Sequence, residues 1–181
     1  SVSYGLISYW TAYFKTNYTA EYMVSLLNSY IGNTEKVTTA VTECGRLKIT
    51  VLPPDINHSE TEFSIKEGSG EDKLAVRFGM AAVKNVGAEA LLPVLKAREK
   101  QGPFASIEQM CRDADMSGLN RKSLESLIKV GAFDAFGDRG ALLAVVDRIL
   151  SLAQSEARLR DSDQTTMFDL FGETVPTPLA T

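Results

Sequence analysis

Residues 76–137 read VRFGMAAVKNVGAEALLPVLKAREKQGPFASIEQMCRDADMSGLNRKSLESLIKVGAFDAFG, and the fold prediction rests mainly on this segment. Two glycine-bearing turns interrupt helical patterns in it, at residues 85–87 and at residues 131–137. Each turn lies between a short apolar helix and a longer one. The pattern is that of two helical hairpins in tandem, and it predicts a mainly helical fold.

The first turn has the composition of a phosphate-binding hairpin. Gly87 has no Cβ atom and can adopt positive φ, and Asn85 is among the residues that tolerate such a conformation best. A helix that starts directly after a tight turn exposes its first N–H groups, which together with the helix dipole attract anions. This is the helix-hairpin-helix arrangement, which grips nucleic-acid backbone. An ordinary helical hairpin with a glycine turn is the alternative, and the residues alone leave both open.

Basic side chains flank both turns. Lys84 enters the first one, and Lys96, Arg98 and Lys100 follow along the next helix. The residues that we predict to contact DNA are Lys84, Asn85, Val86, Gly87, Ala88, Lys96, Arg121, Lys122, Lys129, Gly131, Gly137 and Arg139. Because backbone amides and basic side chains bind phosphates and not base edges, the predicted partner is double-stranded DNA of any sequence.

The net charge of −4 is distributed unevenly along the chain. Residues 1–72 carry five Lys or Arg against nine Asp or Glu, residues 73–150 carry twelve against nine, and residues 151–181 carry two against five. The basic excess therefore falls on the hairpin region, where binding to phosphate requires it. The charge pattern permits nucleic-acid binding without demonstrating it.

The composition is that of an ordinary globular chain of one or two domains, with 181 residues, 44% hydrophobic and 23% charged. No apolar run is as long as a membrane span, so no membrane partner is expected. The start, SVSYGLISYW, has neither an initiator Met nor a secretion signal, so we expect a piece cut from a longer chain. Cys44 and Cys111 lie at apolar helix positions, and two buried reduced thiols fit a cytoplasmic location.

The residues predict no metal site and no catalytic site. A single histidine, His58, and the lack of a cysteine pair argue against zinc. Asp113 and Asp115 lie close in sequence, yet a solvated helix end explains them better than a metal pair does. We therefore expect no metal, no cofactor and no catalytic residue in this chain.

Four segments are expected along the chain. Residues 1–52 are mainly helical, begin with an aromatic-rich, buried helix at residues 4–18 and end in a short strand at 48–52. Residues 53–80 form a small connector with a β-hairpin at 62–78. Residues 81–160 form the tandem hairpin domain, in which Ser106 and Asn120 cap helices and one long helix runs from 139 to 160. Residues 161–181 form a flexible tail. Its apolar island is typical of a peptide that folds onto a partner's pocket, and the alternative is a tail that packs on its own core.

The chain resembles the alpha subunit of bacterial DNA polymerase III, the C-family replicative polymerases. The matching runs are SYGLISYWTAYFKTNYTAEYMVSLL, NTEKV, VLPPDIN, AVRFGMAAVKNVG, GPFASIEQMC, LNRKSLESLIKVGAFDAFG and QTTMFDLFG. They occur in the order of that family and span almost the whole chain. The family usually has Gly-Val-Gly in the first hairpin, whereas this chain has Asn85-Val86-Gly87, which loosens the expected approach of the backbone to phosphate.

The resemblance implies a role for each segment. Residues 1–52 would be the last helices of the fingers, and residues 81–160 would hold the backbone of the duplex that leaves the polymerase active site. Five tail residues match the pentapeptide with which the family docks into the ring-shaped sliding clamp, namely Gln164, Thr165, Thr166, Met167 and Phe168. Other replicase subunits would be partners through the parent chain.

The resemblance also implies what the chain lacks. The family transfers nucleotides with Mg²⁺ ions that are bound by aspartates of a palm domain, and no part of this chain matches that palm. The chain is therefore expected to be a non-catalytic part of a DNA-directed DNA polymerase. Two alternatives are a stand-alone helix-hairpin-helix protein of DNA repair and a protein-interaction module whose glycines only make turns.

Overall fold

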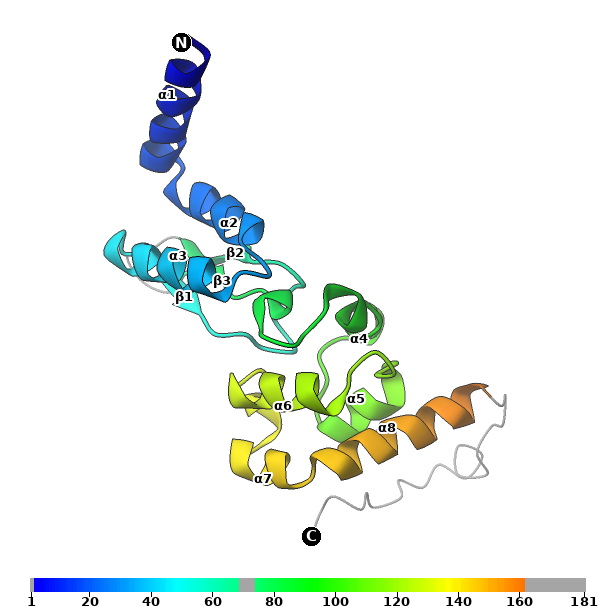
Figure 1. Cartoon of the computed structure of the whole chain (residues 1–181). Coiled ribbons are helices and arrows are strands. Elements are labelled where there is room, and N and C mark those ends of the chain that lie inside the picture. Colours follow the sequence, from blue (N-terminus) through cyan, green and yellow to red (C-terminus); the bar gives the residue numbers. More distant parts are fainter. Residues whose placement is uncertain (1, 69–73, 162–181) are drawn as a thin grey trace.

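The structure, a computed structural model, describes residues 2–68 and 74–161. It is mainly helical with a small three-stranded sheet, which confirms the expected fold class. In Figure 1 one helix projects at the N-terminal end, a module of helices and sheet follows it, and the helices around the two hairpins lie at the opposite end.

Three helices precede the sheet, namely α1 (Val2–Asn17), α2 (Thr19–Ser29) and α3 (Thr34–Arg46). The strands are β1 (Thr50–Leu52), β2 (Ser64–Glu67) and β3 (Leu74–Arg77), and the short 3-10 helix η1 (Met80–Ala82) follows them. The hairpin half consists of α4 (Ala88–Gln101), α5 (Ile107–Asp113), α6 (Arg121–Lys129), the 3-10 helix η2 (Asp134–Phe136), α7 (Arg139–Ala144) and α8 (Val146–Asp161).

The sheet has the strand order β1-β3-β2. Strands β2 and β3 are antiparallel, with Ile65 opposite Val76, so the expected β-hairpin is confirmed. Strand β1 is parallel to β3 and places Val51 beside the same Val76, which is fully buried. The sheet therefore joins residues on both sides of the predicted boundary between positions 52 and 53, and the division into four segments stays a prediction.

Two hydrophobic cores lie on either side of the connector. The first fills the space between α2, α3 and the sheet with Met23, Leu27, Val37, Ala40, Cys44, Ile49, Phe63 and Val76. The second is larger and is built from η1 and α4 to α8, with Leu91, Met110, Leu124, Leu127, Ile128 and Ile149 completely buried in it. Phe78 packs against both cores and so links them.

Hydrogen bonds fix the connector on the hairpin half. The amide of Ile56 donates to the carbonyl of Ala132 in the second hairpin at 2.9 Å. Asn57 donates from Nδ2 to the carbonyl of Phe104, and the amide of Phe104 donates to Asn57 Oδ1, both at 2.9 Å. These bonds span 47 to 76 residues of chain, so the position of the connector depends on the folded hairpin half.

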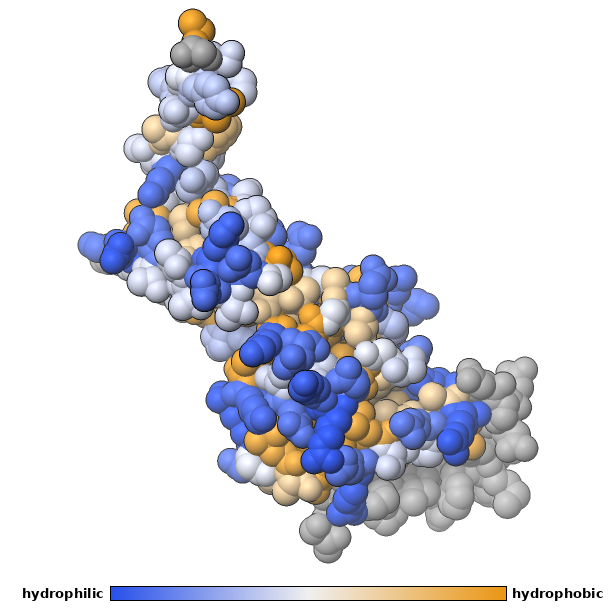
Figure 2. Space-filling model, viewed as in Figure 1, coloured by the Kyte–Doolittle hydropathy of each residue, from blue (hydrophilic) through white to orange (hydrophobic). Residues whose placement is uncertain are grey.

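The aromatic helix expected at residues 4–18 was predicted to be buried, but the corresponding helix α1 is exposed. None of its described residues is buried, and Trp10 and Phe14 are 56% and 48% exposed. The helix contacts α2 and is tied to α3 by an ion pair of 3.2 Å between Lys15 Nζ and Glu43 Oε1. Figure 2 shows apolar surface along the projecting helix. The apolar spacing indicated a tendency to be buried, but among the described residues no element covers most of this helix.

The expected helix from 139 to 160 is also corrected, because it is broken into α7 and α8 at Val145. Two consecutive β-branched residues, Val145 and Val146, disfavour an uninterrupted helix at this point. After the break α8 packs along α5 and buries Ile149 and Ala153 in the second core. Packing on α5 therefore decides the direction of the last helix.

No helix among the described residues has the length and the apolar composition that crossing a membrane requires.

Candidate nucleic-acid interface

The first hairpin connects η1 to α4 through residues 83–87. Val83 and Val86 are buried, and the amide of Val86 donates to the carbonyl of Val83 at 3.2 Å, which closes the turn. Between them Asn85 has a positive φ of 67°, whereas Gly87 has φ −87° and ψ 143°. Asn85 therefore takes the left-handed conformation that the turn requires, and Gly87, which was expected to supply it, does not.

Helix α4 begins with an open N-terminal turn. Gly87 is its N-cap residue and provides no side-chain cap, and no side chain among residues 2–68 and 74–161 is found to accept a hydrogen bond from the first turn. A Cβ atom added at Gly87 would meet no protein atom within 4 Å. Gly87, Ala88 and Glu89 are exposed, so this end of α4 is accessible to solvent, and the helix dipole favours an anion there.

The second hairpin is closed by its own side chains. The carboxylate of Asp138 accepts a hydrogen bond of 2.9 Å from the amide of Ala141 and so caps α7. Arg139 donates to both carboxylate oxygens of Asp134, at 2.7 Å and 2.6 Å, and this pairing lowers the pKa of Asp134. A negative charge of the protein already lies at the N-terminus of α7, so the two hairpins differ in what they offer to a phosphate.

Glycine is required in the second hairpin at Gly131. Its φ is +87°, and a Cβ atom there would overlap the guanidinium of Arg139 and lie 2.7 Å from Asp134 Oδ2. Gly137 also has positive φ, at 145°, and nothing within 4 Å would meet a Cβ atom there. Gly131 and Gly137 thus shape the turn, and the structure gives Gly131 no open face for a ligand.

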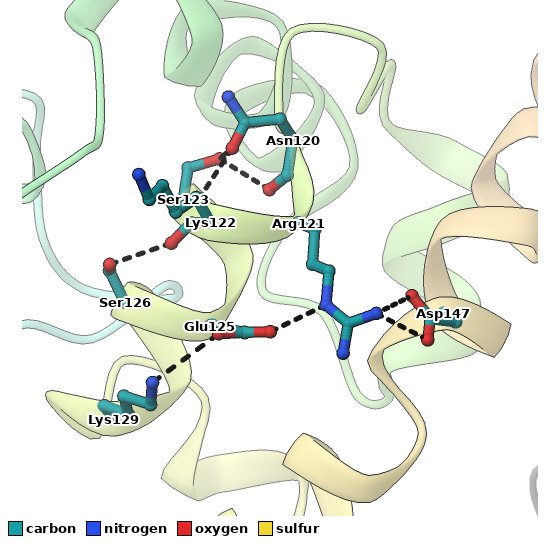
Figure 3. Close-up of polar contacts among 8 residues, drawn as sticks. All are labelled: Asn120, Arg121, Lys122, Ser123, Glu125, Ser126, Lys129 and Asp147. Atoms are coloured by element: carbon teal, nitrogen blue, oxygen red, sulfur yellow. Dashed lines mark hydrogen bonds and ion pairs between the residues drawn. The ribbon is translucent and has the colours of Figure 1, made fainter.

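Helix α6 carries three of the predicted DNA-binding residues. Asn120 caps it by accepting from the amide of Ser123 at 3.0 Å, as expected. Arg121 donates to Glu125 on the same helix at 2.8 Å and to both carboxylate oxygens of Asp147 on α8 at 2.7 Å (Figure 3). Lys129 reaches the same Glu125 at 3.5 Å, and the pKa of that carboxyl is lowered mainly by the hydrogen bond from Arg121. Two of the three cations are therefore engaged in ion pairs within the protein.

Lys122 is exposed at the start of α6, on the side of the helix that faces away from Asp147, and Lys129 follows it two helical turns later. Lys122 does not take part in the ion pairs found among residues 2–68 and 74–161. Ser126 follows one turn later on the same flank, and its hydroxyl donates to the carbonyl of Lys122 at 2.8 Å. The same hydroxyl accepts a hydrogen bond of 3.1 Å from Nδ2 of Asn85, so this flank of α6 adjoins the first hairpin.

The basic residues of α4 have two different roles. Lys96 and Lys100 are exposed, as is Lys84 before the helix. Arg98 is 8% exposed and donates to the carbonyl oxygens of Ile56 and Ser59 at 2.9 Å and 2.6 Å, and to Glu60 Oε2 at 2.9 Å. Arg98 therefore packs inward and holds the connector against α4, unlike the exposed Lys96 and Lys100 on the same helix.

Sequence reasoning missed Ser126, Asp134 and Asp138, which decide the surroundings of the hairpins. Asp138 directly precedes α7 and could have been identified as a helix cap by residue type. Ser126 left no local signal, because its partner Asn85 is 41 residues away in the chain, whereas Asp134 pairs with Arg139 only 5 residues later, across the turn.

The metal and cysteine predictions concern residues that the structure describes. No group of three or more His, Cys, Asp or Glu in the described ranges is placed to hold a metal ion. Asp115 accepts from the amide of Ser117 at 2.9 Å, and this bond lowers its pKa, as in a helix-end turn. Cys44 and Cys111 are free and buried, and burial raises the pKa of Cys111 to about 12. The predicted clamp-binding residues 164–168 lie outside the described residues.

Comparisons with known proteins agree with this geometry. The family model of the helix-hairpin-helix motif matches residues 48–142, which is more than half of the chain and includes both hairpins. The chain is 40% identical over 177 residues to the DNA polymerase III subunit alpha of Mycobacterium tuberculosis, a match that covers 95% of this chain and 14% of that protein. For the corresponding subunit of Thermus aquaticus the identity is 39% over 179 residues, with 99% and 14% covered.

The subunit alpha of Pseudomonas aeruginosa is 32% identical over 196 residues, with 99% of this chain and 16% of that protein covered. The resemblance that the sequence motifs suggested is thereby confirmed, and the chain spans only a small part of the length of the relatives it matches. Residues 48–142 establish that the chain belongs to the helix-hairpin-helix motif family, in a form similar to a segment of bacterial DNA polymerase III alpha subunits.

Proposed function

We propose that this chain binds the sugar-phosphate backbone of duplex DNA within a bacterial replicative polymerase. The observation that carries the proposal is the open first turn of α4, which follows Asn85 and Gly87 inside the segment that matches the helix-hairpin-helix motif. The similarity to DNA polymerase III alpha subunits supports the replicative setting.

The chemistry of the first hairpin suits phosphate and not base edges. Backbone N–H groups at a helix N-terminus donate hydrogen bonds to phosphate oxygens, and the helix dipole adds a favourable electrostatic contribution. Lys84 is exposed directly before the turn and supplies a positive charge. Binding of this kind is independent of DNA sequence and weakens steeply as the salt concentration rises.

The chain is assigned a binding role and no chemistry of its own. In the parent polymerase, nucleotide transfer would use Mg²⁺ held by palm aspartates, and no segment of this chain was matched to that palm. Primer extension with Mg²⁺ and nucleotides tests this assignment, because extension by the purified 181-residue chain would contradict it.

Tail residues 164–168 are proposed to bind the sliding clamp. The pentapeptide Gln-Thr-Thr-Met-Phe combines a glutamine amide, which can donate and accept at a pocket rim, with two large apolar side chains. Simultaneous binding of DNA by the first hairpin and of the clamp by the tail would raise the overall affinity through effective concentration. Other replicase subunits would be reached through the parent chain.

Fluorescence anisotropy of a labelled duplex, titrated with the full chain at several salt concentrations, tests DNA binding. Gly87→Val places a side chain in front of the α4 amides, and φ −87° with ψ 143° suits valine, so the fold should be retained. Gly45→Val is the matched control, because Gly45 is exposed on α3 and also has no protein atom within 4 Å of an added Cβ. We expect Gly87→Val to abolish binding and Gly45→Val to leave it unchanged.

Two results would contradict the proposal. If the unmodified chain does not bind DNA even at low salt, the protein-interaction alternative takes its place. If Gly87→Val binds as well as the unmodified chain, the open turn of α4 is not the phosphate-binding element.

A further inference from the structure

The two hairpins are not equivalent, and the difference lies in their own carboxylates. At the first hairpin no side chain caps α4, and Lys84 is exposed beside the turn. At the second hairpin the carboxylate of Asp138 caps α7, and Arg139 is held by two hydrogen bonds to Asp134. A phosphate that approached α7 would meet the Asp138 carboxylate at the helix cap, whereas the exposed carboxylate in the first turn of α4, Glu89, does not cap its helix.

The cations of α6 are divided in the same way. Arg121 points toward α8, where it is paired with Asp147, and Lys129 is paired with Glu125 (Figure 3). Lys122 lies on the side of α6 away from Asp147, together with Ser126, and two helical turns separate it from the paired Lys129. Of these three cations Lys122 alone has no carboxylate within 4.0 Å in the described part of the chain.

A side-chain contact joins this flank to the first hairpin. Asn85 Nδ2 donates to Ser126 Oγ at 3.1 Å, and Ser126 stands one helical turn from Lys122. The backbones also approach closely nearby, because a Cβ atom added at Gly118, just before α6, would lie 2.9 Å from the Cα of Ala90 in the first turn of α4. Lys122 therefore rises from a helix that is fixed directly against the phosphate-binding turn.

We propose that one composite surface, formed by the first hairpin and the Lys122 flank of α6, binds the DNA backbone, and this proposal rests on the function proposed above. The second hairpin makes no phosphate contact. The surface consists of Lys84, Asn85, Gly87, the open amides of α4 and Lys122. The second hairpin has a structural role, since Gly131, Asp134 and Arg139 stabilise the turn that leads into α7.

The test compares three substitutions that remove the same charge. Lys122→Gln removes the cation of the composite surface, Lys129→Gln removes a paired cation of the same helix, and Arg139→Gln removes the cation of the second hairpin. Anisotropy of a labelled duplex is measured against salt for the full chain and each variant, and circular dichroism verifies that each variant is folded at the temperature used. Because each substitution changes the net charge by the same amount, a difference in DNA affinity between the variants cannot result from net charge alone.

We expect Lys122→Gln to weaken binding about 5-fold at 0.15 M salt and about 15-fold at 0.05 M salt. The slope of log affinity against log salt concentration should fall in magnitude by about one, as expected for one lost phosphate contact. Lys129→Gln and Arg139→Gln should leave the slope unchanged. A slope lowered by Arg139→Gln as much as by Lys122→Gln would overturn the proposal, and so would equal effects of Lys122→Gln and Lys129→Gln.

The same measurements separate this proposal from the proposed function. If the unmodified chain binds DNA and Gly87→Val does not, DNA binding by the first hairpin is supported. If Lys122→Gln then binds DNA as tightly as the unmodified chain, only the composite surface is refuted. If the unmodified chain does not bind, the proposed function fails first and the composite surface fails with it.

Discussion

Asn85 Nδ2 donates a hydrogen bond of 3.1 Å to Ser126 Oγ, and this contact joins the first hairpin to the flank of α6 across 41 residues of chain. The residue also has a positive φ of 67°. Asparagine tolerates this conformation better than other residues with a Cβ atom. The side chain thus adds a tertiary contact that glycine at this position could not make.

Two substitutions at Asn85 separate the hydrogen bond from the backbone conformation. Asn85→Gly keeps the positive φ and loses the bond, so we expect the free energy of unfolding to fall by about 0.5 kcal/mol, the low end for an exposed hydrogen bond. Asn85→Ala also meets the left-handed strain and should lose about 1–2 kcal/mol more. Urea denaturation followed by circular dichroism measures both. Equal stability of the two variants would show that the left-handed conformation is not retained in solution.

Gly131→Ala should be strongly destabilising and Gly87→Ala should not. At Gly131 a methyl group meets φ +87° and the guanidinium of Arg139, so we expect a loss of at least about 1–2 kcal/mol. At Gly87 the backbone is in an ordinary region with open space, and alanine should be neutral or stabilising by up to about 1 kcal/mol. Melting temperatures of the two variants provide the check, and equal values would contradict the positions of both glycines.

Arg98→Met should destabilise the fold, whereas Lys96→Met should not. Methionine keeps much of the apolar stem of Arg98 but leaves the carbonyl oxygens of Ile56 and Ser59 without their donor, a loss of about 1–3 kcal/mol. Lys96 is exposed two residues earlier on the same helix and serves as the control. Urea midpoints measure the difference. A Lys96→Met variant that is the less stable of the two would show that the inward packing of Arg98 is incorrect.

Glu89→Gln should strengthen DNA binding. Glu89 is exposed in the first turn of α4, where its carboxylate competes with phosphate for the positive end of the helix dipole. Removing that charge should tighten binding by about 0.3–1 kcal/mol, roughly two- to fivefold. Glu99→Gln, an exposed position near the other end of α4, is the matched control and should have no such effect. Equal gains from both would indicate a response to net charge alone.

Met167→Ala combined with Phe168→Ala should abolish binding to the sliding clamp. Fully burying each of these side chains is worth about 1.5–3 kcal/mol, and ordering the segment costs about 1–2 kcal/mol per residue, so little affinity remains without them. Calorimetry against the clamp of the same source measures it, with Val175→Ala and Leu179→Ala as a control pair in the same tail. Equal affinities would refute the clamp proposal, and a lower melting temperature of the variant would instead favour a tail that packs on its own domain.

Several elements follow from local sequence because the interactions that form them are local. Ser106 and Asn120 accept hydrogen bonds from amides three residues later, so the residue type before an apolar pattern is enough to identify the cap. The β-hairpin of β2 and β3 follows from alternating apolar residues on either side of a glycine-containing turn. The two glycine turns and the helices on either side of them were recognisable for the same reason, and with them the helix-hairpin-helix arrangement.

Burial and pairing of side chains depend on partners that lie far apart in the chain, so local sequence could not predict them. The same apolar spacing buries α2 and leaves α1 exposed, because burial depends on whether another element covers the helix. Arg98 and Lys122 are both basic residues near the hairpins, yet one is enclosed by the connector and the other faces outward. Residue type and spacing determine which local structures can form, but the free energy of an ion pair or a buried contact depends on distances that only the folded chain sets.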